Sequence, residues 1–405
     1  MERTILHCDL NCFFASVELL GHPELRHLPV AVCGDPTSRH GIILAKNEPA
    51  KAFGIQTAET IWQAKSKCPD LVLLPPHHQQ YRDLSRQVNA IYQEYTDRVE
   101  PFGVDESWLD ITGAIHLFGG NGKALANELR RRLREELGLT ISVGVSYNKV
   151  FAKLGSDYKK PDATTVITPR DMERMVWPLP VGAMLFVGRA TQRVLEPYGV
   201  KTIGDLARFD PHSLESLLGK LGVQLHRYAN GLDDEPVALA GSWTPPKSVG
   251  NGLTFSQNLT TWDEVKTGIA LLCDGVATEL RKNAMVSRTL QLTLRDPKFK
   301  DICRQRPLPR PTQYARELAE TSLDILQDSW KPGSPIRALT VTAQNLIPQE
   351  EGWQQMDLFA GPEEDPQRQK QAHLETAMDA IREKLGKKAI GFSGVIGKGA
   401  REHDL

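Results

Sequence analysis

The chain has 405 residues, of which 40% are hydrophobic and 24% charged, and its formal net charge is −1 at pH 7. This length exceeds a single compact core, so several domains are expected, and the composition excludes a disordered or fibrous protein. No apolar stretch is long enough to cross a bilayer, and the six cysteines form no CxxC pair. We therefore expect a protein of the reducing cytoplasm, without membrane spans, disulfides or zinc.

The first segment is typical of a short strand that ends on a carboxylate. Thr4–Cys8 forms the strand pattern, Asp9 follows it, and residues 11–20 have a helical pattern. Residues 11–78 then predict a separate small lobe. Its further elements are strands at Pro29–Cys33 and Gly41–Leu44 and a helix at Glu59–Cys68 that Pro69 ends.

A second group of acids lies in a predicted hairpin. Residues 99–111 have a strand, turn and strand pattern, with Asp105 and Glu106 at the turn. The neighbouring elements are helices at Tyr81–Thr96, Leu125–Leu137 and Asn148–Asp157 and a strand at Thr140–Ser146. This order predicts an α+β domain with a small antiparallel sheet and helices on one face.

The second half of the chain divides into a helical module, a basic module and a tail. Residues 166–240 contain short helical patterns, and Ser242–Lys247 has the composition of a Pro-rich linker. Residues 241–347 hold 14 Lys and Arg against 10 Asp and Glu, an excess of four positive charges. From residue 348 the composition predicts a flexible tail, followed by a plausible short helix at Leu374–Leu385 to which no role is assigned. The basic module has predicted strands at Gly252–Phe255, Thr289–Leu294 and Ala338–Ala343 and helices at Trp262–Lys282 and Gln313–Gln327.

Asp9, Asp105 and Glu106 could together hold two magnesium ions. Two divalent cations assist transfer of a phosphoryl group to a hydroxyl, because they neutralise the attacking and the leaving oxygen. Magnesium uses one or two carboxylates per site and fills its other positions with water and substrate phosphates, so three acids suffice. Each acid motif by itself is more often a cap, a turn acceptor or a solvated pair.

Three longer stretches carry a family resemblance. They are HCDLNCFFASVE at 7–18, GVDESWLD at 103–110 and SVGVSYNKVFAKLGSDYKKP at 142–161. Each resembles a motif of the Y-family DNA polymerases, and together they are similar to the DinB, or polymerase IV, branch with its UmuC-like domain. The motifs cover residues 1–165, and the later modules are compatible with the thumb and little finger of that family.

The resemblance implies a fold and a set of site residues. It implies an α+β multidomain right-hand polymerase, with a ferredoxin-like palm (1–10 and 79–165), small fingers (11–78), a helical thumb (166–240) and an α/β little finger (241–347). Asp9, Asp105 and Glu106 would be catalytic and would bind two Mg²⁺ ions together with the carbonyl group of Leu10.

The same resemblance assigns the nucleotide site. Phe13 and Phe14 would face the incoming nucleotide, and Phe14 would be the steric gate that excludes a ribose 2′-hydroxyl. The helical pattern alone favours a core aromatic at this position. Lys160 would contact the triphosphate as a point charge.

Residues 45–54 (AKNEPAKAFG) depart from the family pattern. Where the family usually presents a Tyr and an Arg to the triphosphate, this chain has Glu48 and Lys51. Lysine supplies the charge but not the bidentate fork of arginine, and a carboxylate cannot replace a phenol hydroxyl. Lys46 is a candidate to compensate, so Lys46 and Lys51 are the predicted triphosphate contacts of this segment.

Two further features predict macromolecular partners. The stretch QMDLF matches the bacterial clamp-binding pentapeptide, whose anchors would be Gln355, Met356, Leu358 and Phe359. The alternative is that these apolar residues collapse onto the protein's own surface. Basic residues of the module at 241–347 would contact DNA phosphates, although such residues can also form a merely solvated face. The predicted contacts are Lys247, Arg281, Lys282, Arg288, Arg295, Lys298 and Lys300.

We therefore expect a monomeric, error-prone translesion DNA polymerase that uses primer–template DNA and deoxynucleoside triphosphates, docks on a sliding clamp and acts at the nucleoid. The main alternative is a non-catalytic clamp-binding scaffold, which retention of Asp9, Asp105 and Glu106 argues against. A nucleotide cyclase can also place two-metal carboxylates on a ferredoxin-like palm. The lysine-rich third motif, the basic module and the clamp peptide disfavour it.

Overall fold

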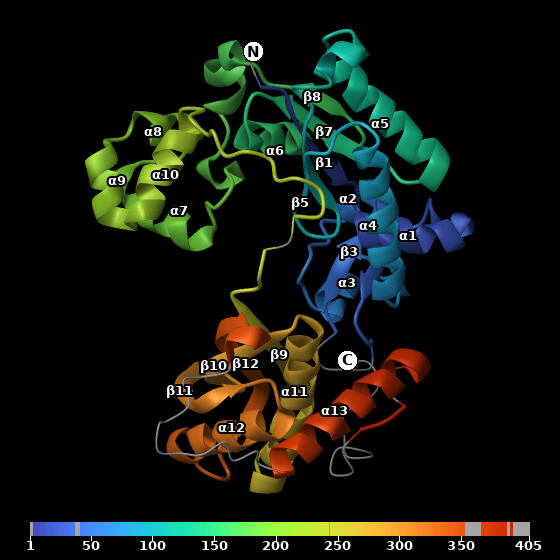
Figure 1. Cartoon of the computed structure of the whole chain (residues 1–405). Helices are drawn as coiled ribbons and strands as arrows, with labels where there is room; N and C mark the ends of the chain where they lie inside the picture. Colours follow the sequence, from blue (N-terminus) through green and yellow to red (C-terminus); the bar gives the residue numbers. More distant parts are fainter. Residues whose placement is uncertain (1–2, 37–40, 243, 353–365, 387–388, 392–405) are drawn as a thin grey trace. The chain divides into compact units, whose positions relative to one another are not determined.

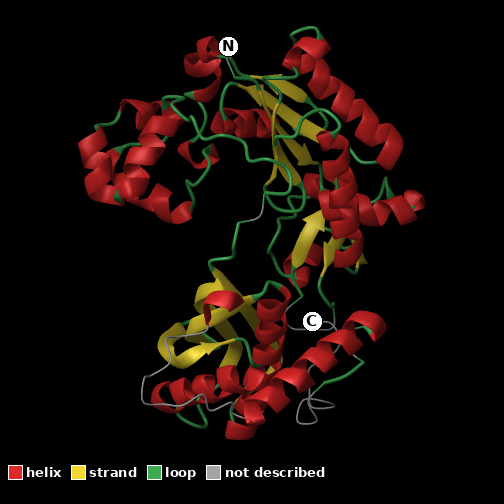
Figure 2. Ribbon diagram, viewed as in Figure 1, coloured by secondary structure: helices red, strands yellow, loops and turns green. Residues whose placement is uncertain are grey.

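The computed structural model describes residues 3–36, 41–242, 244–352, 366–386 and 389–391. They belong to two compact units, the first formed by residues 1–37 and 41–243 and the second beginning at residue 244 (Figure 1). Both units combine helices with strands (Figure 2). Among the described residues, no helix has the length and apolar character needed to cross a membrane.

A five-stranded sheet is the centre of the first unit. Its strand order is β5-β6-β1-β7-β8, in which β1 pairs antiparallel with β6 and β7, and β8 runs parallel to β7. Every residue of β1 is buried. A strand buried on both faces needs cover on both sides of its sheet. The strands are β1 Ile5–Leu10, β5 Val99–Pro101, β6 Glu106–Asp110, β7 Ile141–Ser146 and β8 Thr164–Val166.

Helices cover both faces of this sheet, which corrects the prediction that they lie on one face. The helices α1 (Phe13–Gly21), α4 (His78–Gln93) and α5 (Gly122–Leu137) share a core with Leu6 and Cys8 of β1. On the other face, α6 (Lys149–Tyr158) packs against β1, β7 and β8 (Figure 1).

The close approach of α6 depends on Gly144 of β7. A Cβ atom at residue 144 would lie 1.8 Å from the carbonyl oxygen of Ala152 and 2.5 Å from the amide nitrogen of Ser156. Neither backbone atom can move away without displacing the helix. Because Gly144 is the register partner of His7, the residues of α6 come to lie over the middle and end of β1.

Two smaller regions complete the first unit. A three-stranded sheet in the order β3-β2-β4 has a core of its own, and the helical region after β8 has another, to which α6 contributes Val150, Phe151 and Leu154. The elements of these regions are β2 Val30–Cys33, β3 Ile43–Lys46, β4 Val72–Leu74, α2 Glu48–Ala52, α3 Ile61–Lys67, α7 Arg189–Leu195, α8 Ile203–Arg208, α9 Pro211–Leu218 and α10 Lys220–Ala229.

The second unit is a four-stranded antiparallel sheet in the order β11-β10-β12-β9, with two helices on one face. Leu290, Leu292 and Leu294 of β10 alternate toward the helices, so the residues between them face the other side of the sheet. The elements are β9 Ser248–Leu259, β10 Met285–Arg295, β11 Asp301–Thr312, β12 Ile336–Pro348, α11 Trp262–Lys282 and α12 Ala315–Ser329.

The sequence analysis missed strand β11. This strand is rich in arginine and proline, and its residues are mostly exposed. It lies at the edge of the sheet, where Pro307, Pro309 and Pro311 occupy alternate positions. Proline is tolerated at an edge because the missing N–H can face outward, away from the neighbouring strand. The tertiary position, and not the local propensity, therefore makes this segment a strand.

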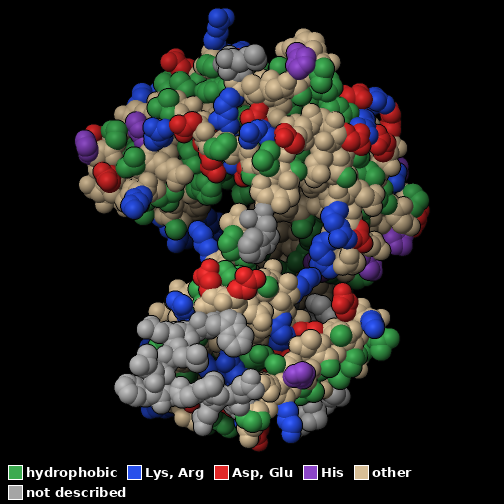
Figure 3. Space-filling view, in the orientation of Figure 1, with side chains coloured by type: hydrophobic (Ala, Val, Ile, Leu, Met, Phe, Trp, Pro, Cys, Tyr) green, Lys and Arg blue, Asp and Glu red, His purple; other side chains and the backbone are tan. Residues whose placement is uncertain are grey.

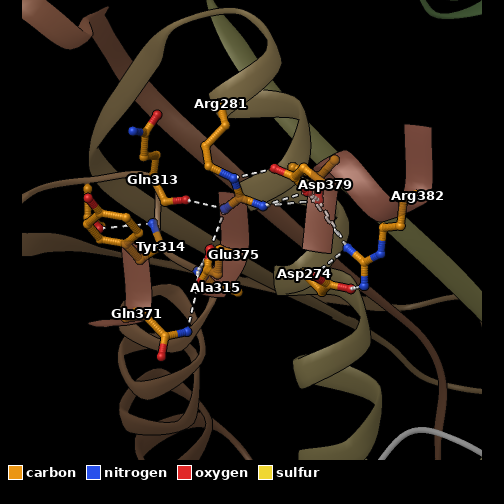
Figure 4. Close-up of polar contacts among 11 residues, drawn as sticks. Asp274, Arg281, Gln313, Tyr314, Ala315, Gln371, Glu375, Asp379 and Arg382 are labelled. Atoms are coloured by element: carbon orange, nitrogen blue, oxygen red, sulfur yellow. Dashed lines mark hydrogen bonds and ion pairs between the residues drawn. The ribbon is translucent and has the colours of Figure 1, made fainter. Parts of the chain in front are cut away.

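Helix α13 (Pro366–Leu385) contains the short helix predicted at Leu374–Leu385, and it corrects the prediction of a flexible tail for residues 366–385. It lies against α11 and α12 and is held there by ion pairs and hydrogen bonds (Figure 4). Glu375 accepts a hydrogen bond of 3.0 Å from the amide of Ala315, the first residue of α12, and pairs with Arg281. The predicted clamp-binding residues 355–359 lie outside the described residues.

Candidate active site

The strand register brings the three predicted acids to one end of the first sheet. Asp9 and Glu106 are register partners in the β1–β6 pair, and the amide of Leu10 donates a hydrogen bond of 2.9 Å to the carbonyl oxygen of Asp105. Directly opposed residues of an antiparallel pair have Cα atoms about 5 Å apart. The three carboxylates thus come from the ends of two adjacent strands.

Burial and mutual repulsion act on these carboxylates. The side chain of Asp9 is only 8% exposed, and this burial raises its pKa although the charge of Lys160 opposes the shift. Burial also raises the pKa of Asp105, and the negative charges of Asp9 and Glu106 raise it further. Hard oxygen donors that repel one another are what a divalent cation binds and stabilises, so the donor set fits a metal of the magnesium type.

Two lysine side chains contact the carboxylates of Asp9 and Glu106. The Lys160 Nζ atom is 2.7 Å from Asp9 Oδ2, and Lys153 forms an ion pair with Glu106. Burial would raise the pKa of Glu106, but the polar contact with His7 and the ion pair with Lys153 outweigh it and lower the pKa to about 2. In the part of the chain that the structure describes, no three His, Cys, Asp or Glu side chains converge as a finished metal-ligand shell. The two ammonium groups instead compensate the negative charge.

The sequence analysis missed the residues that support the acids from beneath. His7 is fully buried, with Nε2 3.1 Å from Glu106 Oε2 and Nδ1 2.8 Å from the hydroxyl oxygen of Ser156. Burial lowers the pKa of this histidine. The sequence did contain a signal for these supporting residues. His7 and Asp9 are two positions apart and so lie on the same face of β1, and Lys153, Ser156 and Lys160 recur at helical spacing.

The two predicted aromatic contacts differ in their surroundings. The ring of Phe13 is 3% exposed and belongs to the core of the first unit, so a contact of this residue with a nucleotide would have to use its backbone. Phe14 is only partly buried, and its ring stacks on that of Tyr81 with a centroid distance of 4.1 Å and an angle of 13°. The Tyr81 hydroxyl donates to Glu18, a buried residue one turn along α1 from Phe14.

The other predicted triphosphate contacts lie at the junction of β3 and α2. Lys51 Nζ is 2.6 Å from Glu48 Oε1, and Lys46 Nζ is 3.0 Å from the hydroxyl oxygen of Thr57. Both lysines therefore already have a polar partner in the first unit.

The predicted DNA contacts of the second unit fall into two groups. Arg281 is only 11% exposed and pairs with Glu375 and Asp379, so it is a structural residue and leaves the set of predicted DNA contacts. Arg295 pairs with Asp301 at 2.7 Å. Of the seven predicted DNA contacts, five are exposed and have no ion pair within the described ranges: Lys247, Lys282, Arg288, Lys298 and Lys300.

The face of the molecule in Figure 3 is neither mainly basic nor mainly acidic. Basic and acidic side chains are interspersed over the visible face, in keeping with the formal net charge of −1. A basic residue therefore has to be judged by its own partners, and not by the charge of the region in which it lies.

Comparison with known proteins gives matches over almost the whole chain. The profile of the impB/mucB/samB family matches residues 8–157, that of its C-terminal domain matches residues 246–358, and a profile described as "DNA polymerase-iota, thumb domain" matches residues 186–233. A DNA polymerase IV of Acetivibrio thermocellus is 47% identical over 386 residues, which cover 95% of this chain and 96% of the relative. This chain belongs to the Y-family DNA polymerases of the polymerase IV type.

Other relatives of this Y-family polymerase agree. DNA polymerase IV 1 of Bacillus subtilis is 35% identical over 397 residues, which cover 98% of this chain and 94% of the relative. The solved structure of the Y-family DNA polymerase chimera Dbh-Dpo4(243-245)-Dbh has a TM-score of 0.75 at 20% identity and covers 85% of this chain and 99% of the chimera. These matches confirm the predicted fold class and family, and they exclude a nucleotide cyclase.

Proposed function

We propose that this Y-family polymerase, a DNA-directed DNA polymerase of the translesion type, transfers nucleotides with two Mg²⁺ ions held by Asp9, Asp105, Glu106 and the carbonyl oxygen of Leu10. The observation that carries the proposal is the β1–β6 register, which places Asp9 opposite Glu106 with Asp105 hydrogen-bonded to the next residue of β1. The non-catalytic scaffold is not favoured, because such a protein has no need of these supported acids.

The residues around the acids have distinct tasks in this proposal. When bound, the two cations activate the primer hydroxyl and neutralise the leaving phosphate. His7 and Lys153 keep Glu106 ionised, since their contacts with its carboxylate hold its pKa low. Lys160 offers a point charge to the triphosphate, and Phe14 blocks the position of a 2′-hydroxyl.

The rest of the chain would position the substrates. Residues 1–10 and 79–165 would act as the palm, 11–78 as fingers, 166–240 as the thumb and 241–347 as the little finger. The face of the second sheet opposite α11 and α12 presents polar side chains, among them Gln291, Thr293, Thr340 and Thr342. Together with exposed basic residues such as Lys298 and Lys300, this face suits a DNA backbone, which is recognised by charge and by hydrogen-bond donors.

Residues 355–359 would add a partner. Their apolar anchors in a polar segment suit a groove on a sliding clamp of the β-subunit type, to which the polymerase would bind as a monomer while it works on nucleoid DNA.

Primer extension with Mg²⁺ tests the catalytic proposal. Asp105→Ala and Glu106→Ala should each lower the rate by about 10³-fold or more, because each removes several kcal/mol of charge stabilisation. Asp83→Ala, which removes a surface acid of α4 whose side chain is 44% exposed, is the control and should extend at the wild-type rate. Undiminished extension by either active-site variant would overturn the assignment.

The clamp proposal needs a separate experiment. Deleting residues 355–359 should leave extension of a short primer unchanged and abolish its stimulation by added clamp. Deleting residues 361–365 instead is the matched control. Stimulation that survives the first deletion would remove the docking assignment.

A further inference from the structure

Four polar side chains gather where α2 begins, beside the start of α1. Glu48 is the first residue of α2, and its Oε1 atom accepts from Lys51 Nζ at 2.6 Å and from the thiol of Cys12 at 3.2 Å. Lys46, the last residue of β3, lies close enough for its charge to act on Lys51. In this cluster the carboxylate of Glu48 is therefore the shared acceptor of Lys51 and Cys12, while Lys46 donates to Thr57.

This cluster lies next to the catalytic strand. Cys12 caps the N-terminus of α1 in a left-handed conformation and directly follows Asn11, which lies in the turn after β1. α1 packs against β2 and β3, the strands that lead into α2. The contact between Cys12 and Glu48 thus ties α2 to the segment that carries both Asp9 and Phe14.

The electrostatics of the cluster suit an anion. Burial and the charge of Lys51 lower the pKa of Lys46, so the two ammonium groups repel each other. Burial alone would raise the pKa of Glu48, but the hydrogen bonds from Lys51 and Cys12 outweigh it and lower the pKa, so Glu48 is ionised at neutral pH. Glu48 supplies the negative charge that the lysines would otherwise take from a ligand.

We propose that Glu48 sets the affinity for the incoming nucleotide, because its carboxylate holds Lys51 Nζ and has to be displaced by the phosphate oxygens of a deoxynucleoside triphosphate. The inference rests on the proposed function, in which Lys51 contacts the triphosphate. Carboxylate and phosphate oxygens are alternative acceptors for the same ammonium group. Glu48 acts as a built-in competitor and weakens nucleotide binding without touching the reacting atoms.

The size of the effect follows from the exposure of the pair. Lys51 is 40% and Glu48 46% exposed, so water and salt screen their attraction and an exposed pair of this kind shifts an equilibrium by about fivefold at most. Removal of the negative charge beside a triphosphate adds a comparable gain. We expect nucleotide affinity to rise about three- to tenfold when Glu48 is neutralised.

Single-nucleotide extension by the full chain provides the test. Glu48→Gln should lower the KM for the nucleotide about three- to tenfold and change kcat much less. Lys51→Met should raise KM, and in the Glu48→Gln/Lys51→Met double variant the gain from Glu48→Gln should shrink, because the cation for which the two anions compete is gone. Glu24→Gln, an exposed acid of the same lobe, should leave KM unchanged.

A purely structural role for Glu48, as an acid in the first turn of a short helix, gives a different result. Glu48→Gln would then lower the melting temperature and leave KM unaltered, which would overturn the proposal. Binding of a non-hydrolysable deoxynucleoside triphosphate, followed by fluorescence anisotropy with primer–template present, measures the same change in affinity independently of turnover. If the wild type binds the analogue but never extends a primer, the proposed function fails while the binding comparison still tests Glu48.

Discussion

The acids of the palm and the basic residues of the second unit were both predicted to be functional from their charge. The structure brings the palm acids together as predicted, but it buries one of the basic residues in an ion pair. In the palm, neighbouring strands fix Asp9, Asp105 and Glu106 together, so residue pattern and position agree. In the second unit, Arg281 has the same sequence appearance as Lys282, yet it turns inward to Glu375. A charge whose place is set by local backbone pairing can be located from sequence. A charged residue that a helix from a distant part of the chain can cover cannot be located in this way.

The nucleotide site beside the palm acids is tested most strongly at Phe14, which lies at the start of α1, the helix that follows the strand carrying Asp9. Phe14→Ala should reduce discrimination against ribonucleotides by roughly 100-fold, because removal of the ring opens the space for a 2′-hydroxyl. The measurement is the ratio of kcat/KM for the deoxy- and ribonucleotide. Phe53→Ala, which truncates an exposed aromatic of the same lobe, is the control. An unchanged ratio in Phe14→Ala would make that residue a packing aromatic.

The covered charge of the second unit gives the next largest effect. Glu375→Ala should destabilise this unit by about 2–3 kcal/mol, because Arg281 keeps, among the described residues, Asp379 alone as an ion-pair partner, and α12 loses the acceptor for its first amide. Urea unfolding of the full chain measures the change. Glu383→Ala, on the exposed side of α13, should cost less than about 0.5 kcal/mol. Equal effects of the two variants would contradict a structural α13.

Basic residues of the same unit that have no ion pair within the described ranges should behave in the opposite way. Lys298→Ala with Lys300→Ala should leave stability unchanged and reduce the slope of log affinity for DNA against log salt by about two, since each phosphate contact releases about one counterion. Arg306→Ala, which removes a surface arginine already paired with Asp324 and Asp328, should change the slope less. Fluorescence anisotropy over a salt series measures it, and identical slopes for all variants would refute the distinction between the two kinds of charge.

The smallest predicted effect is a pH dependence of stability that comes from Tyr81, the residue whose ring stacks on Phe14. Burial and the hydrogen bond to Glu18 raise the pKa of Tyr81 well above its usual value of 10.0. The phenol stays protonated in the folded chain while the unfolded chain ionises, so its contribution to stability is complete below pH 10 and is lost as the pH rises toward the raised pKa. Above pH 10 wild-type stability should fall faster than that of Tyr81→Phe, by at most about 1.4 kcal/mol per pH unit.

Urea unfolding at pH 9, 10 and 10.5 measures this difference. Tyr198→Phe, which changes an exposed tyrosine, should follow the wild type. If the free energy of unfolding depends on pH in the same way for Tyr81→Phe and wild type, the buried hydrogen bond between Tyr81 and Glu18 is not formed.

Residue pattern alone specified the elements whose signals are local. The leucines from 125 to 137 form one face of α5, and Gly138 ends this helix in a left-handed conformation. The strand that stops at Asp9 and the hairpin around Asp105 and Glu106 were likewise readable, because alternation and turn residues act within a few positions.

Tertiary structure decided what depends on residues far apart in the chain. It placed α6 on the second face of the palm sheet through Gly144, laid Lys153 on Glu106, made an edge strand of β11 and closed α13 over Arg281. Each of these outcomes depends on which residue contacts which, and such contacts are set by the surfaces that pack together in the folded chain. Periodicity describes only which face a residue occupies, so it cannot name what will cover that face.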